Sequence, residues 1–375
     1  MTDYEDSREN TRHNVVNAAE LYGKGLISQE RIEPIQRVID TYPMSVTQYY
    51  LGLIKENSYD DPIYKMCIPS LNEQSNEGYF DTSGEGANTI TDGIQHKYDN
   101  TVLLLSTNVC AMYCRHCFRK RMVGQSEEEI LSFVDTAVEY IKKHPEVDNV
   151  LISGGDALML SNKVIEKYLQ KLTAIPHIKF IRLGTRVPVV FPERIMRDGE
   201  LIDILLTYRR FKTIYIVTQF NHRNEITPIS KMALRLLNTA GIPVLNQTVL
   251  LKGVNSNADE LVSLFNGLLE CGISPYYLFQ CRPVKGVKDY FAVPLLEGVD
   301  IVDEARARLS GPAKRFRYAM SHVSGKMEIL GKTKDDRLLI KQHQARLNEN
   351  VNRLITVTAD KDCTWLSDDF EYEEL

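Results

Sequence analysis

Short runs of apolar and β-branched residues recur along the middle of the chain, and longer amphipathic segments separate them. A short continuous apolar run is typical of a strand that is buried on both faces, whereas apolar positions three and four apart indicate a helix that packs on one side. The apolar runs predict six strands, at residues 102–105, 150–153, 180–183, 214–217, 244–251 and 276–279. The amphipathic segments predict helices at residues 127–142, 163–172, 192–206, 229–240 and 258–269.

Strands that alternate with helices predict an α/β fold with a parallel sheet, because each crossover helix returns the chain beside the previous strand. A barrel and a doubly wound sheet both satisfy this pattern. Polar segments follow four of the strands, at the ends where α/β proteins carry their chemistry. They are the cysteine-rich loop 110–117, Ser153 to Asp156, Thr185-Arg186 and Gln219 to His222. A partial (β/α)6 barrel fits this arrangement best.

The regions on either side of this core have a different pattern of apolar and polar residues. We expect a helical N-terminal extension over residues 1–95, the barrel core over 96–310 and a C-terminal α+β segment over 311–375. The extension has amphipathic stretches at 13–26 and 30–39 and a polar stretch at 72–92, and it reads as an addition to the catalytic core. The C-terminal segment predicts a strand at 315–320, a turn at 324–326, a basic helix at 338–347 and a mobile acidic tail.

Composition excludes some classes of function. The 375 residues are 43% hydrophobic and 25% charged, with a formal net charge of −5, so a dominant nucleic-acid role is not expected. No uncharged apolar run approaches the ~20 residues that cross a bilayer, and the acidic N-terminus does not resemble a secretory signal. We therefore expect a cytoplasmic protein with no membrane partner, whose scattered cysteines are free thiols: Cys67, Cys271, Cys281 and Cys363.

Three cysteines stand close together, at Cys110, Cys114 and Cys117. Three thiolates with no fourth can hold a 4Fe-4S cluster that keeps one iron open to an outside ligand, whereas structural zinc sites have four protein ligands. His116 could supply a fourth zinc ligand, so a non-catalytic zinc or iron–sulfur binding module stays open, as do three buried structural cysteines. The three-cysteine arrangement resembles that of the radical S-adenosylmethionine enzymes, which implies that S-adenosylmethionine chelates the open iron and is cleaved to a 5′-deoxyadenosyl radical.

Other segments carry weaker signals. The glycines of Ser153-Gly154-Gly155-Asp156 allow close approach of a ligand, and the carboxylate can receive an ammonium group. Arg119 lies two residues beyond the last motif cysteine and can bind a carboxylate through its planar guanidinium, while Lys120 and Arg121 read as a solvated face. Lys326, in a Ser-Gly-Lys turn, is a candidate for carrying pyridoxal phosphate, although most lysines in such turns are merely exposed.

Six segments in the same order resemble the lysine 2,3-aminomutase family, from about His96 through Lys326. They are Cys-Ala-Met-Tyr-Cys-Arg-His-Cys, Val-Leu-Ile-Ser-Gly-Gly-Asp-Ala-Leu, Arg-Leu-Gly-Thr-Arg-Val-Pro-Val-Val, Phe-Asn-His-Arg-Asn-Glu-Ile, Asn-Gln-Thr-Val-Leu-Leu-Lys-Gly-Val-Asn and Pro-Tyr-Tyr-Leu-Phe-Gln-Cys. The resemblance implies a radical S-adenosylmethionine barrel and a pyridoxal 5′-phosphate-dependent isomerase that moves an α-amino group to the β-carbon.

The resemblance also implies roles for individual residues. Cys110, Cys114 and Cys117 match the ligands of the 4Fe-4S cluster, and Arg119 matches the partner of the substrate α-carboxylate. Lys326 matches the lysine that carries pyridoxal phosphate, and Lys97 matches a basic residue near the cofactor phosphate, where the family has an arginine. The residues that match positions against S-adenosylmethionine are His116, Ser153, Gly154, Gly155 and Asp156.

The sequence departs from the family where the lysine enzymes use two aspartates to hold the distal ammonium of the substrate. The first position, after Cys281, is Arg282, and the second falls on Ala319. Two like charges ~4 Å apart repel by about 4 kcal/mol at an effective dielectric of 20, so Arg282 disfavours lysine and favours a carboxylate. We therefore predict that L-glutamate is converted to β-glutamate. Two alternatives remain: Arg282 points outward or pairs with Asp289 or Glu297, or the enzyme acts on free lysine or a protein lysyl side chain.

The resemblance implies partners as well. A small-molecule amino acid substrate and an external electron donor of the flavodoxin or ferredoxin type are expected, and a homo-oligomer is expected with its geometry open. The C-terminal zinc-binding cysteines of the family are absent, because only Cys363 remains in the tail, so no zinc is carried over.

Overall fold

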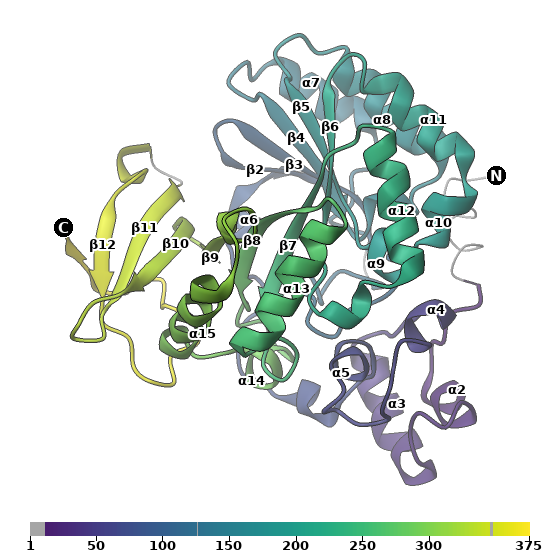
Figure 1. The fold of residues 1–375 in the computed structure, drawn as a ribbon. Helices are drawn as coiled ribbons and strands as arrows, with labels where there is room; N and C mark the ends of the chain where they lie inside the picture. The colour runs from purple at the N-terminus through teal and green to yellow at the C-terminus, as the bar shows by residue number, and fades with distance from the viewer. Residues whose placement is uncertain (1–11, 126, 346–347) are drawn as a thin grey trace.

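A single sheet organises the molecule, and a run of neighbouring parallel strands forms its centre (Figure 1). The computed structural model describes residues 12–125, 127–345 and 348–375, and its strand order follows the chain from β1 to β13. The parallel strands are β3 (Thr101–Thr107), β4 (Asn149–Gly154), β5 (Phe180–Gly184), β6 (Thr213–Thr218), β7 (Val244–Leu250) and β8 (Ser274–Gln280). All six predicted strands are confirmed within a few residues.

Helices cover the outer side of these strands, as Figure 1 shows for α8, α11 and α12. The helices of this region are α7 (Val134–Lys142), α8 (Asn162–Thr173), α9 (Val187–Val190), α10 (Glu193–Arg197), α11 (Gly199–Tyr208), α12 (Pro228–Thr239), α13 (Ala258–Glu270), α14 (Lys288–Phe291) and α15 (Leu295–Arg308). The alternation of strand and helix therefore forms the predicted α/β barrel core.

Two helix predictions were wrong in detail. The segment predicted from residue 127 becomes helical only at Val134, after a turn around the acidic residues 127–129. The helix predicted over 192–206 is two helices, α10 and α11, because Asp198 leaves helical geometry between them (φ −104°, ψ 86°). Its side chain accepts a hydrogen bond from the Leu201 backbone N–H and caps α11.

The N-terminal region is more than an addition to the core, contrary to the sequence-based interpretation. It contains α2 (Ala18–Gly23), α3 (Ile32–Thr41), α4 (Gln48–Leu51), α5 (Pro62–Cys67), α6 (Glu85–Asn88), β1 (Thr89–Thr91) and β2 (Ile94–Tyr98). Strand β2 pairs antiparallel with β3, so the predicted boundary at residue 95 falls inside a strand of the main sheet. The extension also bonds the cysteine loop directly, through Tyr113 N–H to Ser45 O and Arg115 N–H to Met66 O.

The C-terminal segment continues the sheet. Strand β9 (Arg317–His322) pairs parallel with β8 and confirms the predicted strand, and β10 (Gly325–Lys332), β11 (Leu338–Ala345), β12 (Leu354–Val357) and β13 (Glu373–Glu374) follow antiparallel. The predicted basic helix over 338–347 is wrong for its described part, because β11 alternates buried and half-buried residues with the period of a strand.

Part of the acidic tail contacts the sheet, although its side chains other than Phe370 are exposed, and its predicted mobility stays a prediction. The rings of Trp365 and Phe370 lie 6.2 and 5.6 Å from the ring of His322, and β13 pairs with β12. His322 ends the strand that precedes the Lys326 turn, so the tail supports the hairpin that carries this lysine. Within the described residues, no helix has the length and apolar character that a bilayer crossing needs.

Candidate active site

The cysteine loop follows β3 and lies at the carboxyl end of the parallel strands. Cys110 and Cys117 pack against a small cluster of Leu105, Met122 and Val123. Cys114 accepts a hydrogen bond from Arg186 Nη1 at 2.6 Å. Among the described residues, no three His, Cys, Asp or Glu side chains lie close enough together to coordinate one metal ion, and this includes the three cysteines of the loop.

The donor chemistry of the loop nevertheless fits a cluster. Burial raises the pKa of Cys110 well above its usual value, with Asp156 acting in the same direction, and burial raises the pKa of Cys117 to about 11. A neutral thiol is a poor metal ligand, but bound iron stabilises the thiolate and reverses this effect. Three partly exposed thiols on one loop, two of them packed against apolar side chains, match the ligand chemistry of an iron–sulfur site.

Gly154, the last residue of β4, and Gly155 are required by close packing against the cysteine loop. Gly154 has φ +112°, and a Cβ atom on Gly154 would lie 2.5 Å from Thr107 O. A Cβ atom on Gly155 would lie 2.3 Å from Val109 O. The backbone N–H groups of Gly155 and Asp156 donate to Thr107 O and Val109 O. The Ser153–Asp156 segment is thereby fastened to the residues just before Cys110.

The Asp156 carboxylate accepts hydrogen bonds from backbone N–H groups. Its two oxygens accept from Leu158 N–H at 3.0 Å and Arg186 N–H at 2.7 Å. Burial raises the pKa of Asp156, while these hydrogen bonds and one with Thr185 oppose the rise. Only the remaining lone pairs could receive an ammonium group, so the predicted contact with S-adenosylmethionine stays a prediction.

His116 is buried and neutral. Its Nε2 faces the side-chain amides of Asn221 at 3.1 Å and Gln219 at 3.4 Å, while its Nδ1 is buried without a partner among the described residues. Burial lowers the pKa of His116 well below its usual value, and Arg186 and Lys120 act in the same direction. An unpaired buried nitrogen beside the cysteine loop is a ready contact for a polar ligand.

Lys120 is not part of a solvated face, and this sequence prediction was wrong. It is 5% exposed and its Nζ lies 2.7 Å from the carboxylate of Glu73, which is fully buried. Arg115 binds the same carboxylate at 2.5 Å and also donates to Tyr42 O and Pro43 O. Burial lowers the pKa of Lys120 to about 8, although Glu73 acts to raise it. Glu73 therefore ties the extension to the cysteine loop through two cations.

Arg119 and Arg121 share a second buried acid, Glu85 on α6. Arg119 lies 3.0 Å and Arg121 2.8 Å from its two oxygens, and Arg121 also pairs with Glu129 at 2.7 Å. Arg121 is thus half-buried and paired, contrary to the prediction of a solvated face. Burial would raise the pKa of Glu85, but Arg119, Arg282 and Arg121 lower it to about 2. Arg119 also reaches Gly154 O, at 3.4 Å.

Arg282 points into this region rather than toward solvent. Its Nη1 donates to Ser83 Oγ at 2.7 Å, and its guanidinium lies 4.2 Å from the ring centre of Phe118, whose ring Arg119 approaches to 4.5 Å. Burial lowers the pKa of Arg282 to about 10, with Glu85 opposing and Arg119 adding to the shift. The alternative that Arg282 pairs with Asp289 or Glu297 does not hold, because the side-chain hydrogen bond of Arg282 goes to Ser83 and it lies in no ion pair with either acid among the described residues.

Lys326 lies among aromatic rings on β10. Its Nζ is 4.5 Å from the ring centre of Tyr277 and 5.9 Å from those of Tyr98 and Phe279. Burial lowers its pKa to about 7, and the positive charges of Arg182, Arg282, Lys97 and Arg317 act in the same direction. At neutral pH much of this amine is therefore uncharged, as a carbonyl-binding lysine requires.

Lys97 is close to the same hairpin. It extends from β2 and donates to Ser83 O at 3.1 Å and His322 O at 2.6 Å. The N-terminal extension, the barrel and the C-terminal sheet therefore each contribute to the region around Lys326. The structure brings Lys326, Lys97, Arg282 and Arg119 into one neighbourhood beside the cysteine loop, while their ligands stay predictions.

Sequence reasoning missed several residues of this neighbourhood. Arg186 bonds Cys114, Gln219 O at 3.0 Å and Glu225 at 2.6 Å, so it links three strand ends. The segment Thr185-Arg186 follows a predicted strand, but the sequence alone assigns Arg186 no role in the site. Glu73 and Glu85 lie in or beside short helical turns of a polar segment, and no sequence pattern singled them out.

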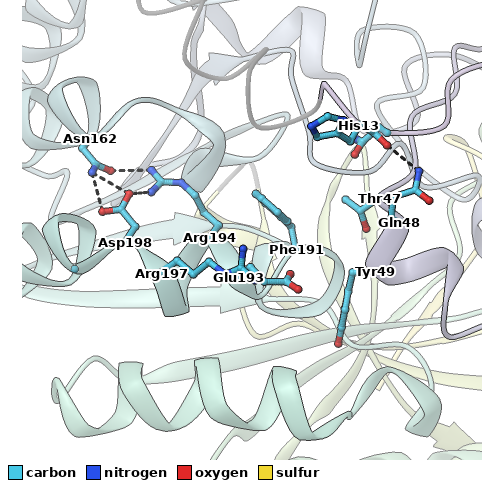
Figure 2. A pocket seen from close by; sticks show the side chains of 12 residues that line it. His13, Thr47, Gln48, Tyr49, Asn162, Phe191, Glu193, Arg194, Arg197 and Asp198 are labelled. Carbon is cyan, nitrogen blue, oxygen red and sulfur yellow. Dashed lines mark hydrogen bonds and ion pairs between the residues drawn. The ribbon is translucent and has the colours of Figure 1, made fainter.

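A cavity lies outside the region around Lys326 and the cysteine loop. It has a volume of about 640 Å³, and Figure 2 shows the side chains of His13, Gln48, Glu193 and Arg197 around it. Arg194 is held at one side by Asp198 and by Asn162. None of the predicted site residues lines this cavity. The candidate site is therefore defined by its side chains and not by this cavity.

Comparisons with known proteins agree with the geometry. Residues 104–265 match the Radical SAM superfamily. A protein of Aquifex aeolicus (strain VF5) with a provisional L-lysine 2,3-aminomutase name is 37% identical over 351 residues, which cover 93% of this chain and 92% of its own. The L-lysine 2,3-aminomutase of Fusobacterium nucleatum is 41% identical over 290 residues, covering 76% and 67%. The glutamate 2,3-aminomutase of Clostridioides difficile is 36% identical over 289 residues, covering 76% and 67%.

Proposed function

The chain belongs to the lysine 2,3-aminomutase family of radical S-adenosylmethionine enzymes and is an amino acid 2,3-aminomutase, and we propose that its substrate is L-glutamate, converted to β-glutamate. An isomerase of this kind moves the α-amino group of an amino acid to the adjacent carbon. What distinguishes one member from another is the group that receives the substrate side chain. In this chain the candidate for that group is a cation.

The inward position of Arg282, which is half-buried beside Phe118, carries the proposal. The guanidinium is held by Ser83 and Phe118, beside the arginine that matches the α-carboxylate partner. Two guanidinium groups that contact one aromatic ring are suited to the two carboxylates of a short dicarboxylic amino acid. The second position at which the lysine enzymes carry an acid is Ala319, which is fully buried and adds no charge.

The residues present fit the cofactors of the family, which are a 4Fe-4S cluster, S-adenosylmethionine and pyridoxal 5′-phosphate. Cys110, Cys114 and Cys117 would hold the cluster, and Lys326 with Lys97 would hold the pyridoxal phosphate. S-adenosylmethionine would lie against His116 and the segment 153–156. When bound, the cluster and S-adenosylmethionine supply the one-electron chemistry that removes a hydrogen atom, and pyridoxal phosphate supplies the conjugated system through which nitrogen migrates.

The protein's own contribution is positioning, charge and exclusion of water. Lys326 offers an uncharged amine because burial and four surrounding cations disfavour its protonated form. The rings of Tyr277, Tyr98 and Phe279 lie around that amine and reduce its contact with water. Arg186 fixes Cys114 and the ends of three strands, so the cysteine loop is held near the residues after β4.

The competing substrate is lysine, free or as a protein side chain, and one observation favours it. A lysine enzyme would need an acid from elsewhere in the fold to offset Arg282, and Glu85 is such an acid, because it acts on Arg282 electrostatically. However, both of its oxygens are engaged by Arg119 and Arg121. Arg282 therefore keeps a net positive field toward the substrate side chain, which supports glutamate.

Exchanging the charge at residue 282 tests the proposal. We expect Arg282→Asp to lower kcat/KM for glutamate by about 100- to 1000-fold, because an attraction of about 3 to 4 kcal/mol is removed, and to raise relative turnover of lysine. Arg282→Lys keeps the charge and should retain most glutamate turnover. Arg306→Gln, a substitution of a half-buried arginine on α15, is the matched control. Equal activity of Arg282→Asp and wild type toward glutamate would contradict the proposal.

A further inference from the structure

Four cations surround Lys326, and the carboxylates near them are already engaged. Arg182, Arg282, Lys97 and Arg317 all act on the lysine. A cluster of like charges in a partly buried site is unfavourable unless an anion lies among them. The question is which of these side chains has hydrogen-bonding capacity left for that anion.

Arg182 has such capacity. It lies on β5, and its Nη2 donates to Asn149 Oδ1 at 2.5 Å, while its Nε is buried with no hydrogen-bond partner among the described residues. The carboxylate that acts on it, Asp148, lies 3.1 Å from Lys179. A buried guanidinium nitrogen without a partner is unfavourable, and a bound anion would supply the missing acceptor.

The strand face that bears Arg182 is the face of the candidate site. On β5, the half-buried residues Phe180, Arg182 and Gly184 alternate with fully buried ones. A Cβ atom on Gly184 would lie 3.1 Å from Ser153 Oγ, so this face looks toward the segment predicted to contact S-adenosylmethionine. Asn149, which anchors the Arg182 guanidinium, donates in turn to Thr101 Oγ1 at the start of β3. The Arg182 guanidinium is thus held by Asn149 through Nη2, while its Nε lacks a hydrogen-bond acceptor among the described residues.

We propose that Arg182 binds the phosphate group of the pyridoxal phosphate carried by Lys326, sharing this anion with Lys97. The inference rests on the proposed function, because it requires pyridoxal phosphate at Lys326. A guanidinium offers paired donors in one plane that match two phosphate oxygens, and an ammonium such as Lys97 adds a point charge. Arg182 is the better-placed of the two for hydrogen bonding, since Lys97 already donates to two carbonyl oxygens.

Comparing pyridoxal phosphate with pyridoxal tests this assignment. The full-length protein, with its cluster reconstituted and pyridoxal phosphate removed, is titrated with each compound, and attachment to Lys326 is measured by borohydride reduction and peptide mass. We expect Arg182→Gln to weaken attachment of pyridoxal phosphate by about 10- to 100-fold more than attachment of pyridoxal, because loss of the Arg182 charge near Lys326 acts on both compounds and only pyridoxal phosphate also loses the phosphate contact. Arg182→Lys should recover part of the affinity, and Arg306→Gln should match wild type with both compounds.

The same titrations distinguish a failure of the Arg182 assignment from a failure of pyridoxal phosphate dependence. Equal weakening for pyridoxal phosphate and pyridoxal in Arg182→Gln would assign Arg182 a structural role and overturn the inference, as would no weakening for either compound. Inorganic phosphate should compete with pyridoxal phosphate in wild type and compete less in Arg182→Gln; equal competition in both would also overturn it. If wild type attaches neither compound at Lys326, the pyridoxal phosphate dependence in the proposed function fails, and this inference falls with it.

Discussion

At the scale of single residues, the chemistry of the site depends on side chains whose charge is changed by burial. Lys326 and Arg282 both have a lowered pKa for this reason, to about 7 and about 10. The two shifts have different consequences. The lysine becomes a neutral amine near physiological pH, whereas the arginine stays a cation and sets the sign of the pocket.

Attachment of pyridoxal phosphate to Lys326 should therefore depend on pH. A folded-state pKa of about 7 means that the reactive neutral amine falls tenfold for each pH unit below 7 and is fully formed above about pH 8. The initial rate of borohydride-trapped attachment should rise from pH 5 to 8 and then level off. Lys326→Arg should abolish it, while Lys314→Arg, at an exposed lysine, should not. A rate that keeps rising beyond pH 9 would contradict the lowered pKa.

Sequence reasoning named most of these residues because they lie in short motifs, but it could not supply their partners. Arg119 and Arg282 could be selected because they match positions of the family. Their common neighbour Glu85 could not, because it is 34 residues from Arg119 in sequence. Lys120 and Arg121 were misjudged for the same reason. A run of basic residues looks solvated until a distant segment brings acids to it.

At the scale of elements, the cysteine loop has no regular structure of its own and is held by its neighbours. The Glu73 carboxylate, fully buried, binds Arg115 and Lys120 from the side of the extension. Gly154 and Gly155 hold the loop from the side of β4. Both contacts can be tested without changing any cysteine.

Removing the Glu73 charge should loosen the loop. Glu73→Gln leaves Arg115 and Lys120 buried without a counter-ion, which costs about 3 to 5 kcal/mol in the free energy of unfolding and should lower iron retention after reconstitution. Glu33→Gln breaks an exposed pair with Arg37 and should change stability by less than about 1 kcal/mol. Urea titration and iron analysis measure both effects. Equal stability of the two variants would show that the buried pair does not hold the loop.

A methyl group on Gly155 should also disturb the loop, because its carbon would sit 2.3 Å from Val109 O. We expect Gly155→Ala to destabilise the protein by about 1 to 3 kcal/mol and to reduce iron content. Gly199→Ala is the matched control, since nothing lies within 4 Å of a Cβ atom there and the position opens α11. Normal iron content in Gly155→Ala would argue against the close packing described.

The predicted elements were most accurate where one periodicity dominates. The six parallel strands are continuous apolar runs, so their positions follow from sequence alone. Strand β11 was taken for a helix because Lys341, Gln342 and Gln344 make the second half of the segment polar, although its buried residues, Gln342 among them, alternate with half-buried ones. Its identity is set by pairing with β10 and β12, which a local pattern does not reveal.

At the scale of the whole molecule, the site needs all three regions of the chain. The extension supplies Glu73, Ser83 and Glu85, the barrel supplies the cysteine loop, and the C-terminal sheet supplies Lys326. The barrel could be predicted from the alternation of strands and helices. The participation of the extension could not, because it rests on contacts between segments far apart in sequence.

The most direct test of the central claim is a product assay on the reconstituted enzyme. Reduced protein with S-adenosylmethionine and pyridoxal phosphate is given glutamate, lysine, aspartate or arginine, and the β-amino acids are identified by mass spectrometry. The account predicts β-glutamate as the main product, with lysine turned over about 1000-fold less efficiently because of its repulsion by Arg282. Turnover of lysine without turnover of glutamate would contradict it.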